Sequence, residues 1–351
     1  MINQVELKNF GPMEQLNWQG LGKINLIIGN NDCGKSFLLK ALYSAMRTLE
    51  EYKRGENPQS LNEILVDKIF WTFQSENIGN LVNYNANSSL SFNLDFENKL
   101  FKYDFSRDTK RSIRSLHSDI EPRQDNSIFL PAKEVLSIYH FILESEINFR
   151  FGFDSTYMDL ANALKIPATK AFPSSHNISL PSDKLGRDSD DFNQARNLLA
   201  NLINGKIEFD EVNKRWYFHK DKQRFPMGVT AEGIKKIAIL DTLLGNGYLN
   251  ENSIIFIDEL ESALHPEAIS KLLDIIAILA KHGIQFFIAS HSYFVIKKLC
   301  LIAQEQKMSI PVISKENNDW VSSDLLEEIP DNAIINESIR LYQQEVSFAL
   351  A

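Results

Sequence analysis

The fold is decided by one short stretch of the chain, Gly29-Asn30-Asn31-Asp32-Cys33-Gly34-Lys35-Ser36. It satisfies the pattern of a glycine, four free positions and then Gly-Lys-Ser. An apolar strand is predicted before it, from Ile24 to Ile28, and a helix with one apolar face after it, from Phe37 to Leu49. Glycines in such a strand–turn–helix unit let backbone N–H groups and a helix N-terminus converge on phosphate oxygens. The stretch therefore predicts a phosphate-binding loop, or P-loop. The alternative is a Gly-rich turn with an exposed lysine.

The predicted loop assigns roles to its residues. Lys35 is expected to place a positive charge near the β- and γ-phosphates, and the Ser36 hydroxyl is expected to bind Mg²⁺. The expected cofactors are ATP and Mg²⁺. The residues predicted to contact the nucleotide are Gly29, Asn30, Asn31, Asp32, Cys33, Gly34, Lys35 and Ser36.

A second apolar run, from Ser253 to Ile257, ends in Asp258 and Glu259. A buried parallel strand delivers such carboxylates to the carboxyl edge of its sheet, where ligands bind. Asp258 is expected to hold Mg²⁺ through the water shell of the ion, which prefers one or two carboxylates together with phosphate oxygens. Glu259 is expected to polarise the attacking water as a catalytic residue beside Lys35. An ordinary solvated acid at a strand end is the alternative.

A third buried strand, from Gln285 to Ala289, is followed by Ser290-His291-Ser292. Its place one crossover helix beyond Asp258 and Glu259 predicts that His291 stands at the same sheet edge. His291 is therefore a candidate catalytic residue that senses the γ-phosphate. The alternative is a histidine beside a helix cap.

Strands alternate with helices over the last part of the chain, which predicts a parallel sheet with right-handed crossovers. Alternating apolar residues from Leu90 to Phe105 predict an antiparallel hairpin, and a second hairpin is expected from Ile207 to His219. A helix is expected from Glu134 to Asn148. The predicted fold is α/β, with an N-terminal antiparallel β part, a central mostly parallel sheet and a helical insertion. The predicted domains are a core of residues 1–50 and 205–325, an insertion of residues 51–204 and a C-terminal helical segment of residues 326–351.

Composition limits the function classes. The 351 residues carry a formal charge of −9, which argues against a protein coated in nucleic acid. A basic stretch at Arg107, Lys110, Arg111 and Arg114 is a solvated loop or a local nucleic-acid groove. No run of about 18 apolar residues or signal peptide is present, so we expect no membrane span and a cytoplasmic location. The two cysteines fit a reducing compartment.

Taken in this order, the three motifs resemble the ABC-type ATPase heads of the SMC, RecF and OLD-like group, over about residues 1 to 50 and 225 to 300. The opening Leu7-Lys8-Asn9-Phe10-Gly11 is similar to that group's first strand and turn. Asn31 and Asp32 in the loop resemble the OLD-like branch, as do Glu259-Leu260-Glu261 and the following Leu264-His265-Pro266. The resemblance is closest to OLD-like bacterial anti-phage defence ATPases that lack a Toprim domain.

The resemblance implies that two copies close around Mg-ATP. The counterpart of the signature segment, which caps the partner's γ-phosphate in such heads, is Val229 to Lys236. Thr230 as N-cap and Gly233 as an accessible backbone position are expected to bind the phosphate. Glu232 departs from the pattern and implies slow hydrolysis, or ATP that serves mainly to join the subunits.

The implied protein is therefore an ATPase that forms a homodimer or higher oligomer. It would act as the sensor or regulatory subunit of an abortive-infection system with a separate effector, a nuclease or toxin, because the segment after Cys300 is too short for a Toprim domain. The alternative is a RecF-like DNA-repair or DNA-loading ATPase, so nucleic acid stays open as a partner. An ABC transporter subunit is a third class, disfavoured by the poor signature segment.

Overall fold

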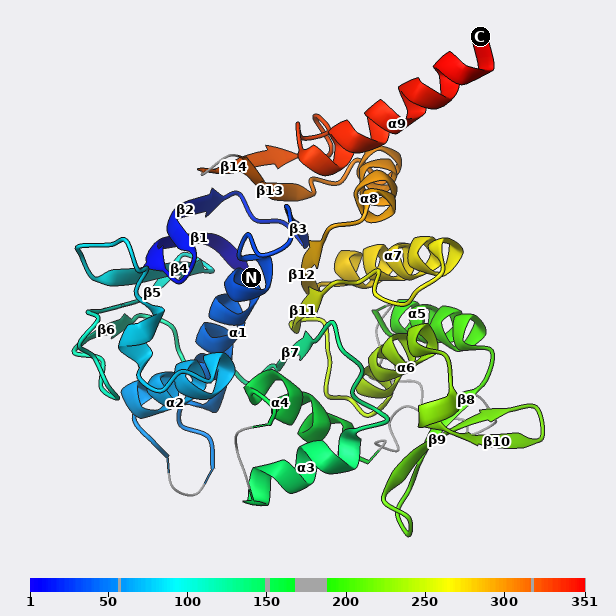
Figure 1. Cartoon of the computed structure of the whole chain (residues 1–351). Helices are drawn as coiled ribbons and strands as arrows, with labels where there is room; N and C mark the ends of the chain where they lie inside the picture. The colour runs from blue at the N-terminus through cyan, green and yellow to red at the C-terminus, as the bar shows by residue number, and fades with distance from the viewer. Residues whose placement is uncertain (56–57, 149–151, 168–187, 317–318, 351) are drawn as a thin grey trace. The chain divides into compact units, whose positions relative to one another are not determined.

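The computed structural model describes residues 1–55, 58–148, 152–167, 188–316 and 319–350 (Figure 1). The chain divides into two compact units. The first unit holds residues 1–123, 258–260 and 287–351, and the second holds residues 124–257 and 261–286. Residues 29–36, Asp258, Glu259 and His291 all lie in the first unit, whereas Thr230 and Gly233 lie in the second.

An antiparallel sheet forms the N-terminal β part of the first unit, as the sequence predicted. Its strand order is β2-β1-β4-β5-β6. The strands are β1 (Ile2–Phe10), β2 (Met13–Gln19), β4 (Leu90–Phe96), β5 (Lys99–Phe105) and β6 (Ser115–Ser118). Period-2 alternation buries one face, on which Phe92 stacks against Tyr103 with ring centroids 4.9 Å apart. This confirms the hairpin predicted from Leu90 to Phe105.

The remaining strands of the first unit have the order β14-β13-β3-β12. They are β3 (Ile24–Ile28), β12 (Gln285–Ser290), β13 (Pro311–Glu316) and β14 (Asp319–Asp324). Strand β13 runs parallel to β3 and antiparallel to β14. The helices of this unit are α1 (Lys35–Glu51), α2 (Leu61–Phe73), α8 (Tyr293–Gln306), α9 (Ala333–Leu350) and the 3₁₀ turn η1 (Ile78–Leu81). Strand β3 is buried at all five positions, as expected for a strand covered on both faces.

The second unit joins β7 (Ser127–Leu130) to β11 (Ile254–Asp258) in a parallel pair, with Ile254 opposite Ser127. A three-stranded antiparallel sheet, β8 (Lys206–Asp210), β9 (Arg215–Lys220) and β10 (Gln223–Pro226), adds a strand to the predicted second hairpin. The helices are α3 (Tyr139–Asn148), α4 (Ser155–Leu164), α5 (Asp188–Ile203), α6 (Glu232–Gly245), α7 (Pro266–Lys281) and the short η2 (Met227–Val229). The region between the loop and α6 thus contains strands as well as helices.

The helix predicted from Glu134 to Asn148 begins five residues late, at Tyr139. The Glu134 carboxylate accepts the Ser137 N–H at 2.6 Å, which holds residues 134–137 in a turn. The prediction of its start was therefore wrong. The boundaries of the predicted domains at residues 50, 205 and 325 remain a prediction.

The predicted C-terminal segment contains one long helix, α9, which contacts α8 (Figure 1). Only Ile335 is buried among its described residues. Tyr342 is 66% exposed and Phe348 is 82% exposed. This helix therefore presents large apolar side chains to solvent.

Candidate nucleotide-binding site

The loop from Gly29 to Ser36 connects β3 to α1, as predicted. Gly34 is the N-cap of α1 with a φ of 103°, a conformation that L-residues rarely adopt. At Gly29, a Cβ would lie 2.7 Å from Cys33 Sγ. Both glycines are therefore required by the path of the backbone.

Lys35 is held inside this loop. Its ammonium donates hydrogen bonds to the carbonyl oxygens of Gly29 and Asn30, each at 2.8 Å, and the residue is 7% exposed. Cys33 Sγ lies 4.0 Å from the same nitrogen. The loop thus fixes a positive charge beside the N-terminus of α1, where anions bind favourably.

The Ser36 side chain contacts the last residue of β11. Its hydroxyl donates to Asp258 Oδ1 at 3.0 Å, and Asp258 is 9% exposed. A hydroxyl and a carboxylate oxygen are ligands that Mg²⁺ accepts, with phosphate oxygens and waters completing its octahedron. Ser36 and Asp258 therefore fit a Mg²⁺ site.

Glu259 and His291 lie beside this pair, at the ends of β11 and β12. The Glu259 N–H donates to the Ala289 carbonyl oxygen at 3.0 Å, and Glu259 has a positive φ of 47°. His291 Nδ1 lies 3.9 Å from Glu259 Oε1. The Glu259 side chain is 40% exposed, so water reaches its carboxylate. The structure thus brings Lys35, Ser36, Asp258, Glu259 and His291 together within the first unit.

The segment from Thr230 to Gly233 differs from its predicted form. Helix α6 begins at Glu232 with Ala231 as N-cap, and the Thr230 hydroxyl donates to the Pro226 carbonyl oxygen at 3.3 Å. The prediction that Thr230 caps this helix is therefore wrong, because its hydroxyl is used in the preceding turn.

Gly233 is buried, contrary to the expected accessible backbone. A Cβ there would lie 2.7 Å from Leu264 Cδ2 and 2.9 Å from the Ala263 carbonyl oxygen. This glycine lets α6 pack closely against residues 263–264. Phosphate contacts by Thr230 and Gly233 remain a prediction.

Lys235 was missed by sequence reasoning. It is 2% exposed, and its ammonium donates to Glu232 Oε1 at 2.7 Å and to Ser137 Oγ at 2.9 Å. Glu134 Oε2 lies 3.9 Å away. The signal was the i, i+3 spacing of Glu232 and Lys235. Glu232, which departs from the signature pattern, thus forms an ion pair with a lysine of its own helix.

Two arginines of the basic stretch, Arg107 and Arg111, make structural contacts within the first unit. Arg107 donates to the carbonyl oxygens of Asn83, Tyr84 and Ala86, and the Arg111 guanidinium lies 4.3 Å from the centre of the Phe70 ring. These two arginines hold neighbouring loops and helices in place.

The chain is similar to known proteins in sequence and in fold. Residues 24–297 match the family described as "AAA domain, putative AbiEii toxin, Type IV TA system". An "ATP/GTP phosphatase" of Helicobacter pylori (strain ATCC 700392 / 26695) is 24% identical over 335 residues, which cover 87% of this chain and 89% of that protein. The crystal structure of an SmcHead bound to the C-winged helix domain of ScpA covers 93% of this chain and 98% of that chain, with 13% identity and a TM-score of 0.54. The last likeness shows the fold. Within the described ranges, no helix has both the length and the apolar character needed to span a membrane.

Proposed function

Because the chain belongs to this AbiEii-type AAA family and is an ABC-type P-loop ATPase, we propose that it binds Mg-ATP at residues 29–36 and hydrolyses it with Glu259. The observation that carries the assignment of the site is the 3.0 Å hydrogen bond from Ser36 Oγ to Asp258 Oδ1. It supports a site in which a P-loop hydroxyl and a strand-end carboxylate would together hold one Mg²⁺.

Each residue then has a role in the reaction. Lys35 leaves its two carbonyl partners to neutralise the β- and γ-phosphates. Glu259 accepts a proton from the water whose oxygen attacks the γ-phosphorus, while the bond from that phosphorus to the bridging oxygen breaks and its electron pair stays on ADP. His291 donates a hydrogen bond to a γ-phosphate oxygen. Ser36 and Asp258 would hold Mg²⁺, which would supply charge neutralisation for the leaving diphosphate.

We propose further that two copies close around the nucleotide, with residues 230–233 of one copy facing the loop of the other. An ABC-type core of residues 1–50 and 205–325 would carry both surfaces, and residues 51–204 would form an insertion. Glu232 lowers the affinity of that segment for phosphate, so turnover is slow. The ion pair between Glu232 and Lys235, at 2.7 Å, reduces the repulsion between Glu232 and phosphate without removing it.

The proposed biological role is the sensor or regulatory subunit of an OLD-like anti-phage system in the cytoplasm, with a separately encoded nuclease or toxin as effector. The family description names a putative toxin of a type IV toxin–antitoxin system, which is compatible with a defence role. The exposed apolar face of α9 supports a protein partner, because solvent-exposed clusters of large apolar side chains often mark interaction sites.

Phage challenge tests this role. Cells that carry the native locus should survive phage, whereas Lys35→Ala and Glu259→Gln in the chromosomal copy should each abolish protection while protein levels stay equal. Unchanged protection in both variants would refute the defence role. An ATP-dependent affinity for duplex DNA that falls steeply with salt would instead indicate the RecF-like alternative.

A further inference from the structure

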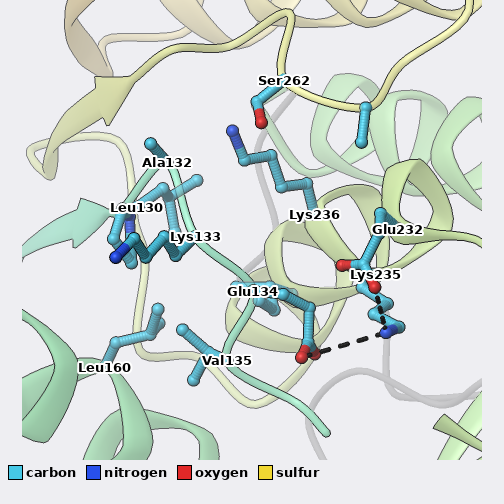
Figure 2. A pocket seen from close by; sticks show the side chains of 13 residues that line it. Leu130, Ala132, Lys133, Glu134, Val135, Leu160, Glu232, Lys235, Lys236 and Ser262 are labelled. Carbon is cyan, nitrogen blue, oxygen red and sulfur yellow. Dashed lines mark hydrogen bonds and ion pairs between the residues drawn. The ribbon is translucent and has the colours of Figure 1, made fainter. Parts of the chain in front are cut away.

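A cavity of about 320 Å³ lies within the second unit, and Glu232 of the segment 230–233 is among the residues that line it (Figure 2). It is bounded by the segment after β7, by α4, by the first turns of α6 and by Ser262 and Ala263. Leu130, Val135, Leu160 and Ile239 give it a buried apolar wall. Its volume falls at the lower end of the range for small-molecule sites, about 300–1,000 Å³.

More positive than negative side chains surround this apolar wall. Lys133, Lys235 and Lys236 line the cavity together with only two acids, Glu134 and Glu232. Lys235 is bound to Glu232, as the dashed lines of Figure 2 show. The lining therefore carries one more positive than negative side chain, in a chain whose formal charge is −9.

Two properties of the polar side chains favour the binding of an anion. Burial raises the pKa of the Glu134 carboxyl, which disfavours its negative form. Lys133 makes no hydrogen bond or ion pair with the residues that the structure describes, and Figure 2 shows the Lys236 ammonium extending toward Ser262. An anionic group would thus find ammonium donors and a hydroxyl at the edge of an apolar wall.

We propose that this cavity is a binding site for a small organic anion, a molecule with an apolar body and one carboxylate or phosphate group. The apolar body lies against Leu130, Leu160 and Ile239. The anionic group lies between Lys236, Ser262 and Lys133. None of the residues that line this site belongs to the loop 29–36, whereas Glu232 belongs to the segment proposed to face the partner's nucleotide.

Binding can be measured with the full chain and the fluorescent probe 1-anilinonaphthalene-8-sulfonate, an aromatic body with one anionic group. Wild-type protein should bind it saturably. The double variant Lys133→Glu/Lys236→Glu should bind about tenfold or more weakly, since a lost charged contact contributes about 1.4 kcal/mol or more. The matched control is Lys220→Glu/Lys281→Glu, which makes the same charge change at exposed lysines of the same unit that do not line the cavity.

A second variant, Ile239→Trp, fills the cavity without changing charge and should abolish the saturable phase. Octanoate and phenyl phosphate serve as competitors, and displacement by one of them identifies the preferred anionic group. Octanol is the uncharged control and should displace the probe at least tenfold less well than octanoate. Equal probe binding by wild type and both cavity variants, or displacement by octanol as strong as by the anions, would overturn the proposal.

Discussion

The Ser36 hydroxyl and the Asp258 carboxylate, 222 positions apart in the sequence, are joined by a hydrogen bond of 3.0 Å. This contact connects the start of α1 to the end of β11. It holds the two side chains that would take part in a Mg²⁺ site within hydrogen-bond distance of each other.

Asp258→Asn tests the metal role, because the amide keeps the shape of the side chain and its oxygen but loses the charge. We expect ATP turnover at saturating Mg²⁺ to fall about a hundredfold or more, the equivalent of about 2.7 kcal/mol of transition-state stabilisation. Phosphate release measured across a Mg²⁺ titration checks this. A variant with the wild-type rate and Mg²⁺ dependence would remove Asp258 from the site.

Gly34→Ala tests the strained start of α1. The new Cβ would meet Pro12 Cγ at 3.0 Å, and the residue must keep a φ of 103°, so we expect a loss of about 1–3 kcal/mol in unfolding free energy. Gly20→Ala is the matched control, since Gly20 has a φ of 67° with nothing within 4 Å of the added Cβ. Thermal melts and ATP binding should show a larger defect for Gly34→Ala; equal defects would argue against the crowding at the loop.

The buried ion pair between Arg123 and Glu50 gives a stability prediction for the first unit. Arg123 Nη1 lies 2.7 Å from Glu50 Oε1, and the Glu50 side chain is fully buried. Arg123→Ala removes one ion-pair partner of a buried carboxylate that also pairs with Arg47, so we expect a loss of about 3 kcal/mol in unfolding free energy. Denaturant titration measures it. The double variant Arg123→Met/Glu50→Leu should recover most of that loss, and failure to recover would point to lost packing instead.

Lys235 offers a test of charge compensation in α6. Lys235→Met leaves Glu232 unpaired in the proposed sandwich segment, and we expect slower ATP turnover. Glu232→Gln removes the carboxylate and should raise turnover above wild type, because phosphate then meets less repulsion. In the double variant, the effect of Lys235→Met on the rate should be smaller than in the single variant, as measured by a double-mutant cycle. Additive effects would show that the two residues act separately.

Much of this structure was predictable where turn chemistry bounds an apolar run. Strand β3 ends before Gly29, β7 ends before Pro131, and α7 begins with Pro266 after a His265 side chain that accepts the Glu267 N–H. Such local signals set the limits of these elements. The three motifs then predicted the cluster of Lys35, Ser36, Asp258, Glu259 and His291.

Other features depend on contacts between distant residues. Strand β13 forms beside β3, almost three hundred positions earlier, and its own sequence gives no sign of that partner. The burial of Lys235 depends on Ser137, 98 positions away. Thr230 has the composition of an N-cap, yet the preceding turn at Pro226 takes its hydroxyl.

Mixed protomers test the shared site. Lys35→Ala disables the loop, and Ala231→Trp places a bulky side chain at the exposed start of α6, so each variant alone should lack activity. An equal mixture should recover about a quarter of the wild-type rate, because half of the dimers are mixed and each has one intact site across a two-fold interface. No recovery on mixing, with both variants folded, would argue that each copy hydrolyses ATP alone.

The central claim is that ATP joins two copies until Glu259 hydrolyses it. Its most direct test is the solution mass of Glu259→Gln with and without Mg-ATP, beside Lys35→Ala as the variant that cannot bind nucleotide. We expect Glu259→Gln to double in mass only when Mg-ATP is present, and Lys35→Ala to stay unchanged in both conditions. If Glu259→Gln binds ATP and keeps the same mass, the nucleotide-sandwich account is contradicted.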